Sequence, residues 1–571
     1  SSRVLLLTGL YEQESYEMPS GKLLVKRPDE ESGKYSYSLI RPNLDASKVL
    51  TGDESGFISI YDDKGKTLFH EDIAEAGVRE IFPSPDNAYA YIILVNGTIQ
   101  VINQETGKVL GTLYVFNNNN DYVFMAPDGR FDGTRNGMEQ LKLLRNRQEI
   151  SLDKVFETFY TPNLYQRLIS GEAFEPIPSD IIKPFPLVKI SYAEATRNLE
   201  VDDDIPTYQN KTGFADITVN ATAQDDAVDE IRLFINGKIQ TLTTRNLIVA
   251  DNNGSDTKKY QVSLLPGTNT IRAVALNSQR TESDPDEITV IYNAGNTNNS
   301  EIKPASNTNN AIPVAVVDKN ATLHLVAVGI NTYQNKSMSL NYALADATSF
   351  KEEVEKDAKT VIGNIKTYFI TDNTADKTGI TNALKQVQQN AKPQDVFIFY
   401  YAGHGVIGKN NEFYLVPTDV SDLKNVQTEL ESKGIAAKLL QQYAIDIPAQ
   451  KQLFILDACQ SAGAFEAMLS ADGNQQKSIA VVARSTGTHW IAASGAQQFA
   501  NEFASLGHGA FTYVLLEALK GAASNNKMIT VNNLKNYLQQ TVPELMKKYH
   551  GAAQYPASYG LGNDFPVEVM K

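Results

Sequence analysis

DVFIFYYAGHG (residues 395–405) and KQLFILDAC (residues 451–459) are the two stretches that decide the fold of the C-terminal part of this chain. Each is almost continuously apolar and then ends in small and reactive residues. Strands that are apolar on both faces are typical of a parallel sheet covered by helices on both sides. In such sheets, functional groups follow the carboxyl ends of the strands. If the two strands are neighbours, His404 and Cys459 emerge at the same edge.

The same pattern extends outward from these strands over residues 322–571. Further apolar strands alternate with helical patterns such as LNYALADATSFKEEVEK, KTGITNALKQVQQNA, TELESKGIAAKLLQQ and GAFTYVLLEALKG. Alternation of strands and helices predicts an α/β fold with a mostly parallel sheet between two helical layers.

The chain before this region has an all-β pattern. The phrases SGFISIYDDKGKTLFH (55–70) and NGTIQVINQETGKVLGTL (96–113) each alternate apolar and polar residues around a turn, which is the signature of a repeated hairpin. They resemble blades of a WD-type propeller, but only about two to three blades fit into residues 1–150. We expect a partial propeller there, with an irregular antiparallel sheet domain as the alternative. Residues upstream of Ser1 could complete the propeller.

The middle of the chain predicts a connector, a sandwich and a linker. SLDKVFETFYTPNLYQRLISGE has helical spacing, whereas the Asn236-Gly237 dipeptide between alternating apolar runs is a strong hairpin signal. Regular turns without a helical period favour an immunoglobulin-like β-sandwich. The expected order is therefore propeller repeats at 1–150, a helical connector at 151–186, the sandwich at 187–293, a flexible linker at 294–321 and the α/β domain at 322–571.

Composition and charge exclude some classes of partner. The formal net charge is −15 and the isoelectric point is near 5.0, so neither nucleic acid nor an anionic membrane is expected as a partner. The chain contains a single cysteine, which excludes an intramolecular disulfide and weakly favours a reducing compartment. A cytoplasmic location is expected on this ground. The absence of an initial methionine leaves room for upstream residues, such as a signal peptide.

His404 and Cys459 together indicate nucleophilic catalysis. A thiolate is a good nucleophile once an imidazole has taken its proton, and the imidazolium can later protonate a leaving amine. The backbone amides of Gly405 and Cys459 are the expected oxyanion hole. Alone, each residue has a simpler interpretation, because free cysteine is often a small buried hydrophobe and a lone histidine is often a turn residue. We expect His508, in a second GHG segment, and His489 to be structural.

YYAGHG and LDACQSAG resemble the histidine and cysteine boxes of the caspase and metacaspase family of cysteine peptidases. HLVAVGINTYQNKSMSLNYALADATSF is similar to the opening strand and first helix of that family, and WIAASGAQQFANE, GHGAFTYVLLEALKG, MITVNNLKNYL and GLGNDFPVEV are similar to the smaller-subunit half of bacterial members called orthocaspases. The resemblance covers residues 322–571, and the order of propeller repeats, sandwich and peptidase is also similar to that bacterial group. It implies a bacterial cysteine endopeptidase with His404 and Cys459 as catalytic residues.

The resemblance also implies the specificity. In metacaspases that prefer arginine or lysine, acids at the positions of Asp346 and Asp457 line the primary pocket, and paired carboxylates suit a guanidinium. Protein substrates with exposed Arg or Lys are therefore expected. Two departures are Ala462, where the cysteine box has glycine, and Ala402, where some metacaspases have serine.

Calcium and self-cleavage are two further questions that the resemblance raises. Calcium-dependent metacaspases carry an aspartate cluster after the histidine, but Thr428-Glu429 stands here where paired aspartates are expected. Asp419 and Asp422 are too few oxygen ligands, so we expect no cofactor or metal, although calcium stays open. The segment 469–490 is expected to be an exposed loop in which Lys477 and Arg484 are possible self-cleavage sites.

Two other functions remain open at this stage. The protein could be a catalytically silent scaffold whose N-terminal modules bind a partner, or a caspase-like protease specific for aspartate. Retention of both His404 and Cys459 speaks against the scaffold, and Asp457 speaks against aspartate specificity. In the main hypothesis, the N-terminal repeats bind a protein partner or restrain the protease.

Overall fold

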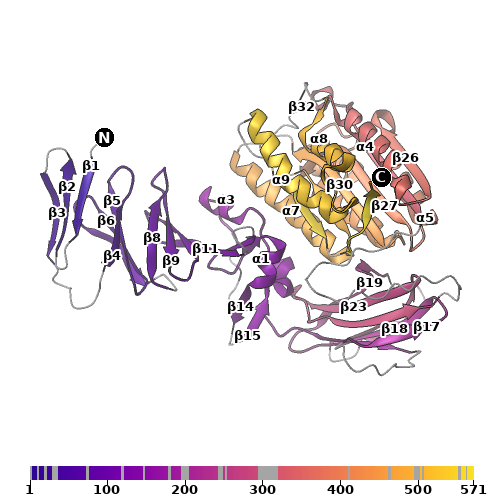
Figure 1. The fold of residues 1–571 in the computed structure, drawn as a ribbon, viewed down its shortest axis with the longest axis horizontal. Helices are drawn as coiled ribbons and strands as arrows, with labels where there is room; N and C mark the ends of the chain where they lie inside the picture. The colour runs from indigo at the N-terminus through magenta and orange to yellow at the C-terminus, as the bar shows by residue number, and fades with distance from the viewer. Residues whose placement is uncertain are drawn as a thin grey trace. The chain divides into compact units, whose positions relative to one another are not determined.

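The structure is a computed structural model (Figure 1), which describes residues 3–8, 12–18, 22–28, 37–72, 76–116, 121–145, 148–175, 177, 182–193, 205–241, 249–250, 254–293, 319–408, 412–460, 465–493, 502–503, 507–550, 555–560 and 562–570. The chain divides into two compact units, Ser1–Ile181 and Ile182–Lys571. Among the described residues, no helix has both the length and the apolar character needed to cross a membrane.

The first unit consists mainly of antiparallel sheets. A three-stranded sheet is followed by a four-stranded sheet in the order β4-β5-β6-β7 and a six-stranded sheet in the order β13-β12-β11-β10-β9-β8. The strands are β1 Arg3–Thr8, β2 Glu12–Met18, β3 Lys22–Pro28, β4 Tyr37–Pro42, β5 Lys48–Asp53, β6 Phe57–Asp62, β7 Thr67–Asp72, β8 Val78–Pro83, β9 Tyr89–Leu94, β10 Ile99–Asn103, β11 Val109–Phe116, β12 Asp121–Met125 and β13 Phe131–Gly133. Residues of β5, β6, β8 and β9 share one core. These sheets confirm the predicted all-β class of the N-terminal region.

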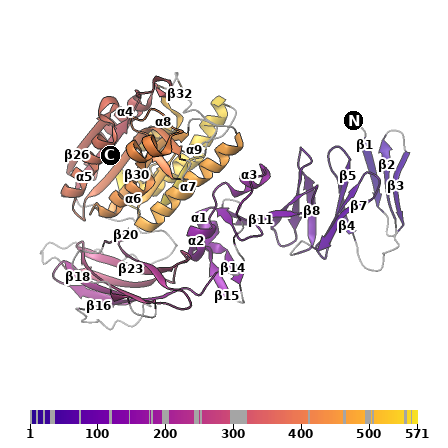
Figure 2. The same ribbon diagram turned by 180° about the vertical axis from the view of Figure 1, so that it is seen from behind.

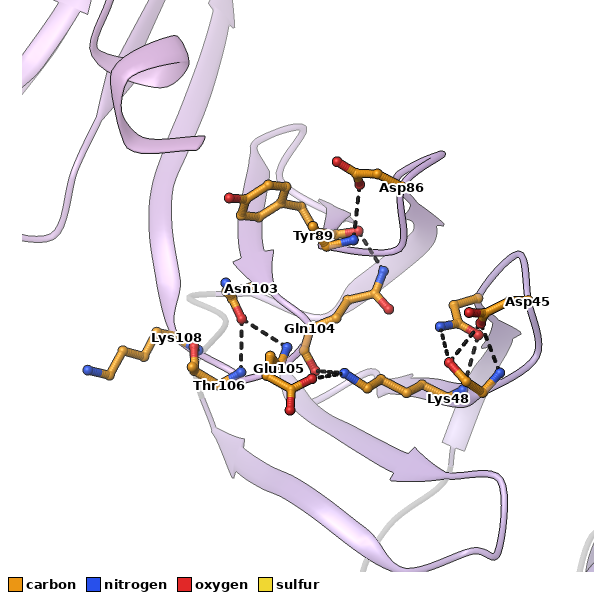
Figure 3. Close-up of polar contacts among 12 residues, drawn as sticks. Asp45, Lys48, Asp86, Tyr89, Asn103, Gln104, Glu105, Thr106 and Lys108 are labelled. Carbon is orange, nitrogen blue, oxygen red and sulfur yellow. Dashed lines mark hydrogen bonds and ion pairs between the residues drawn. The ribbon is translucent and has the colours of Figure 1, made fainter. Parts of the chain in front are cut away.

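A polar contact joins the two larger sheets of this unit (Figure 3). The Lys48 Nζ donates to the Gln104 carbonyl at 3.1 Å and to the Glu105 carboxylate at 2.5 Å. The Asn103 side chain accepts from the backbone N–H groups of Glu105 and Thr106, which fixes the turn that presents these acceptors.

Short elements close the first unit. The helix α1 (Arg135–Gln140) precedes the hairpin of β14 (Lys142–Arg145) and β15 (Gln148–Ser151), and α2 (Phe156–Phe159) and α3 (Leu164–Ile169) follow. The helical spacing in SLDKVFETFYTPNLYQRLISGE thus corresponds to α2, α3 and a preceding 3-10 turn, Leu152–Val155.

The second unit begins with two facing β-sheets, which Figure 2 shows from behind. One has the order β16-β18-β22-β21 and the other the order β17-β24-β23-β19-β20. The strands are β16 Leu187–Tyr192, β17 Thr207–Asn210, β18 Phe214–Thr222, β19 Val228–Ile235, β20 Lys238–Ile239, β21 Val249–Ala250, β22 Asp256–Ser263, β23 Gly267–Asn277 and β24 Asp286–Tyr292. Alternate residues of both sheets form one core. Asn236 and Gly237 both have positive φ and connect β19 to β20, as the dipeptide predicts.

The rest of the unit is built on a mixed, mostly parallel sheet with the order β26-β25-β27-β30-β31-β35. Its strands are β25 Thr322–Gly329, β26 Asn364–Thr371, β27 Val396–Ile407, β30 Lys451–Gln460, β31 His489–Ala492 and the antiparallel edge strand β35 Ala557–Gly560. The short strands β28 Phe413–Leu415 and β29 Ile435–Ala436 extend from β27. This arrangement confirms the predicted fold class for the C-terminal region.

Helices cover both faces of this sheet (Figures 1 and 2). One core contains residues of α5, α6 and α7 and the other contains residues of α4, α8 and α9. The helices are α4 Ala343–Asp357, α5 Lys377–Asn390, α6 Ala437–Asp446, α7 Phe465–Thr486, α8 Ala510–Glu517 and α9 Val531–His550. Alternate residues of β27 point to opposite cores, because side chains alternate along a strand: Tyr401 belongs to the first core and Tyr400 to the second.

The structure corrects two expectations about secondary structure. The helix expected over TELESKGIAAKLLQQ is interrupted: a π-helical turn at Val426–Glu431 and the strand β29 precede α6. The interpretation of residues 469–490 as an exposed loop is wrong, because most of this segment belongs to α7. Its apolar residues Ile479, Ala480, Val482 and Ala483 recur at helical spacing and are buried.

Candidate active site

His404 and Cys459 lie opposite each other on neighbouring parallel strands. The register of β27 and β30 pairs Ala402 with Asp457, Gly403 with Ala458 and His404 with Cys459. The prediction that the two strands are neighbours is therefore confirmed. Positions 457 and 459 are two residues apart and so lie on the same side of β30.

The imidazole of His404 is buried and has a defined hydrogen-bond partner. The residue is 8% exposed, its Nε2 lies 2.6 Å from the Met338 carbonyl oxygen, and its ring packs at 4.9 Å from the Tyr333 ring. Because a carbonyl oxygen only accepts, Nε2 carries the hydrogen, and Nδ1 is the basic nitrogen of the neutral ring. Burial lowers the pKa of His404 from its ordinary value, which favours this neutral form.

The backbone of His404 is fixed from both sides of the strand. Its N–H donates to the Tyr333 hydroxyl at 2.9 Å, and its carbonyl accepts from the Tyr401 hydroxyl and from the Val416 N–H. These contacts fix the backbone of the histidine within β27, which continues to Ile407.

The two glycines beside His404 are required by packing. A Cβ on Gly403 would lie 2.7 Å from the Tyr401 hydroxyl, and one on Gly405 would lie 2.9 Å from the Phe413 ring. Neither distance is compatible with a side chain unless neighbouring groups move. The predicted oxyanion donors, the amides of Gly405 and Cys459, belong to the last paired positions of β27 and β30.

Asp346 and Asp457 come together on the face of the sheet covered by α4 and α8. Asp346, in the first turn of α4, is 4% exposed and accepts from His508 Nδ1 at 2.7 Å and from the Gly509 N–H at 3.2 Å. Asp457 accepts from the Thr512 hydroxyl at 2.6 Å. The predicted pair of acids thus shares one site: the two residues before α8 donate to Asp346, and Thr512 in the first turn of α8 donates to Asp457.

The two carboxyl groups share one largely buried region, where the negative charge of one disfavours the ionisation of the other. Burial and the negative charge of Asp346 raise the pKa of Asp457 to about 7. The buried Tyr400 hydroxyl lies 2.6 Å from the Thr512 hydroxyl, and burial together with both carboxylates raises the pKa of Tyr400. Since Thr512 donates to Asp457, its oxygen accepts from Tyr400. The arrangement leaves a partly ionised pair near neutral pH, which a cation would convert to its fully ionised form.

Several residues of the site were not identified from the sequence. Tyr333 and the Met338 carbonyl hold His404, and Thr512 and Gly509 hold the acids. His508 was expected to be structural, whereas the structure brings it to Asp346. The segment GHGAFT, which contains the start of α8, was the available signal, because N–H groups at a helix N-terminus favour carboxylates.

The two proposed self-cleavage residues do not lie in a loop. Lys477 is in α7, and Arg484, near the end of the same helix, is 9% exposed and paired with Glu282 of the sandwich at 3.2 Å. Cleavage after either residue would require local unfolding of α7, because a protease binds its substrate in an extended conformation. His489 is buried against Lys535 and the Asn563 carbonyl.

Of the two candidate calcium ligands, Asp422 accepts from the Lys424 N–H, whereas Asp419 Oδ1 is buried without a hydrogen-bond partner among the described residues. Glu429 accepts from the Ser421 N–H and pairs with Lys433. Burial raises the pKa of Asp419. In the part of the chain that the structure describes, no three His, Cys, Asp or Glu side chains form a group that could hold a metal ion.

Comparisons with known proteins identify the C-terminal domain. Residues 323–564, which are less than half of the chain, match the family model of the caspase domain. A search of the curated proteins found no match. This domain is therefore that of a caspase-like cysteine peptidase.

Solved structures give weaker likenesses. Fibronectin(III)-like modules of Clostridium thermocellum CbhA are 16% identical over 19% of this chain and 100% of that chain, with a TM-score of 0.13. The structure of U3-55K is 15% identical over 23% of this chain and 44% of that chain (TM-score 0.18), and the WD40 β-propeller domain of Doa1 is 16% identical over 23% and 47% (TM-score 0.16). The chain thus spans less than half of the latter two, and scores this low carry no argument.

Proposed function

We propose that this caspase domain is an active cysteine endopeptidase that cleaves proteins after arginine or lysine, with Cys459 as nucleophile and His404 as general base. The observation that carries the proposal is the register that sets His404 opposite Cys459, together with the Met338 carbonyl that selects the tautomer of His404.

In the proposed mechanism, the imidazole first accepts a proton and later donates it. His404 Nδ1 takes the thiol proton, and the thiolate attacks the substrate carbonyl carbon to form a tetrahedral oxyanion, for which the amides of Gly405 and Cys459 are the proposed donors. The imidazolium then gives its proton to the leaving amine as the C–N bond breaks. Water, deprotonated by His404, hydrolyses the resulting thioester and restores the thiol.

The acidic pair supports the proposed specificity. Asp457 lies on the strand that carries Cys459, and Asp346 lies on the neighbouring helix α4. A guanidinium or ammonium group would compensate the charge of these two largely buried carboxylates. An aspartate side chain in the same pocket would meet like charge, which disfavours the aspartate-specific alternative.

We further propose that the N-terminal sheets, which are WD-type repeats in this proposal, bind a protein partner, and that the protein acts in a bacterial cytoplasm. Neither cofactor nor calcium has a step in the proposed mechanism. No nucleic acid or membrane partner is proposed, because the net charge of −15 disfavours both.

Hydrolysis of short fluorogenic peptides ending in Arg, Lys or Asp tests the proposal, with and without calcium. The full chain should cleave the Arg and Lys peptides, and the Cys459→Ala variant should not. The matched control is Ser59→Ala in the N-terminal unit, which should retain full activity. Turnover of the Asp peptide alone would favour the aspartate-specific alternative. No turnover of any peptide by the folded chain would favour the scaffold.

A further inference from the structure

The sandwich covers the carboxyl-terminal end of α7. Arg484, in the last turn of this helix, is 9% exposed, and its Nε and Nη2 lie 3.3 and 3.2 Å from the two carboxylate oxygens of Glu282, which follows β23. Glu282 itself is 7% exposed. A buried ion pair is screened by the solvent much less than a pair on the surface. These two side chains therefore hold the end of the helix against the sandwich.

The turn between β19 and β20 lies against the residue that ends α7. Gly487 has a positive φ of 66°, and a Cβ at this position would lie 1.6 Å from the carbonyl oxygen of Gly237 in the turn. Only a residue without a side chain fits such a close approach of two backbones. The neighbouring Asn236 side chain donates to the Gln450 side chain at 2.8 Å, directly before β30. The same turn thus contacts the end of α7 and the start of the strand that carries Cys459.

Apolar packing adds to these contacts. Residues of β19 and β23 alternate between the interior of the sandwich and a second cluster on the opposite face of their sheet. Ile445 of α6 packs against this second cluster, and Lys238 Nζ donates to the Ile445 carbonyl at 3.0 Å. The members of the cluster are Phe234, Ile239, Val274 and Leu276. The peptidase domain therefore covers an apolar face of the sandwich.

The peptide bond after Arg484 is enclosed by these contacts. Ser485 is 4% exposed, and its hydroxyl accepts from the Gln441 side chain of α6 at 2.8 Å. A protease binds its substrate in an extended conformation, so this bond is cut only when the end of α7 opens. The rate of such cleavage follows the population of the open form, which the contacts with the sandwich keep low.

We propose that the sandwich protects the Arg484–Ser485 bond, and that separation of the sandwich from the peptidase domain makes this bond a site of self-cleavage. The second part rests on the proposed function, which assigns cleavage after arginine to this domain. Hydrolysis consumes one water and leaves a carboxylate on Arg484 and an amino group on Ser485. It divides the chain between β30, which carries Cys459, and β31. The sandwich thereby controls whether the peptidase domain stays one chain.

Limited digestion of the full-length Cys459→Ala protein with trypsin, which cuts after arginine and lysine, tests the protection without self-cleavage. Mass spectrometry of the new amino terminus at Ser485 gives the initial rate of cleavage after Arg484. Glu282→Gln should raise this rate by about tenfold or more, because it leaves a buried arginine without its carboxylate partner. Should this variant fail to fold, Ile445→Ser provides the test, since it weakens the apolar contact and leaves the ion pair intact.

Two controls separate opening of the helix end from general loosening of the domain. Asp216→Asn changes an exposed carboxylate on β18 and should leave the rate unchanged. Cleavage after Lys477, about two turns earlier in α7, should rise less in Glu282→Gln than cleavage after Arg484, because a helix opens from its end. Equal increases at both residues would overturn the proposal.

The same substitution in the chain that retains Cys459 tests the link to the proposed function. Glu282→Gln should then cleave itself after Arg484. If trypsin cuts the variant faster but the active chain cleaves neither itself nor arginine peptides, the protection stands and the proposed function fails. If trypsin cuts the Cys459→Ala protein and its Glu282→Gln variant at equal rates, the inference is overturned whatever the activity of the native chain.

Discussion

Two segments of this chain share the sequence Gly-His-Gly, and the structure gives their histidines different surroundings. His404 lies in the last third of the central strand β27, is buried, and donates to the Met338 carbonyl. His508 ends a two-residue strand, is partly exposed, and contacts the Asp346 carboxylate. A neutral acceptor does little to hold a proton on the opposite nitrogen, whereas a carboxylate stabilises the imidazolium. The same tripeptide thus places its histidine against a neutral backbone carbonyl at one position and against a carboxylate at the other.

This difference shows that the chemistry of a histidine is determined by its acceptor atom and burial. Burial lowers the pKa of His404, so the ring is available to take a proton from a thiol. The position of each segment in the sheet decides which acceptor it meets. The predictions below test this contrast, beginning with the largest expected effect.

His404→Gln should abolish turnover of arginine peptides, with a loss of at least about 10³-fold in kcat, because it removes the imidazole that takes the thiol proton in the proposed mechanism. Initial rates at pH 8 under saturating substrate measure this effect. His508→Gln should act mainly on KM, which initial rates over a series of substrate concentrations at the same pH measure. Equal losses of kcat in both variants would contradict the contrast between the two histidines.

Asp457→Asn should lower kcat/KM for peptides ending in arginine or lysine by about 10²-fold, because it removes one of the two charges that face the cation. In the native chain, KM for these peptides should rise as the pH falls through about 7, where Asp457 takes up a proton. This rise should be smaller in the variant. A KM profile that is identical in both proteins would show that Asp457 does not face the substrate.

Asp457 should also make the stability of the fold depend on pH. Its folded pKa of about 7 lies above the ordinary value of 3.8, so the folded state binds the proton more tightly than the unfolded chain. The contribution of protonated Asp457 to the free energy of unfolding is therefore full at acid pH and is lost as the pH rises through about 7. In thermal unfolding at pH 8, Asp457→Asn in the Cys459→Ala background should raise Tm, whereas at pH 4 the difference should shrink. A lower Tm at pH 8 would contradict this assignment.

Gly405→Ala should destabilise the domain by about 1–3 kcal/mol, because the added methyl group would overlap the Phe413 ring. Gly509→Ala should be milder, since its nearest neighbour would be an Asp346 oxygen at 3.3 Å. Urea unfolding of both variants measures the difference. A Gly509→Ala protein less stable than Gly405→Ala would reverse the expected order.

Tyr333→Phe should have the smallest effect. It removes the hydroxyl that accepts from the His404 N–H, which is a hydrogen bond worth about 0.5–1.5 kcal/mol. We expect kcat to fall by about 3- to 10-fold, with little change in KM. Steady-state kinetics against Tyr537→Phe, a tyrosine of α9, provides the control.

Much of the fold could be predicted because its signals are local. The strands 395–405 and 451–459 are apolar on both faces, and that property specifies a buried parallel sheet. Asp346 and Asp457 followed from the family resemblance, since residues 111 positions apart in the sequence carry no local signal of contact.

The errors arose where long-range contacts decide the structure. The polar, glycine-bearing start of α7 looks like a loop, but burial of Ile479 and Ala483 stabilises a helix. The partner of Arg484 lies 202 residues away. The acceptor of the His404 imidazole is a backbone carbonyl, that of Met338. Every residue has such a carbonyl, so no pattern of side chains could have indicated this contact.

The ion pair between Arg484 and Glu282 has a practical consequence for preparing the peptidase domain by itself. A protein shortened to begin at residue 319 would retain the arginine of α7 and lose its carboxylate partner, and Ile445 would lose its apolar neighbours in the sandwich. The newly exposed apolar side chain reduces solubility, and the loss of the contacts with the sandwich reduces thermal resistance. Shortened proteins should therefore start before residue 187, or replace Arg484 and Ile445 together with small polar residues.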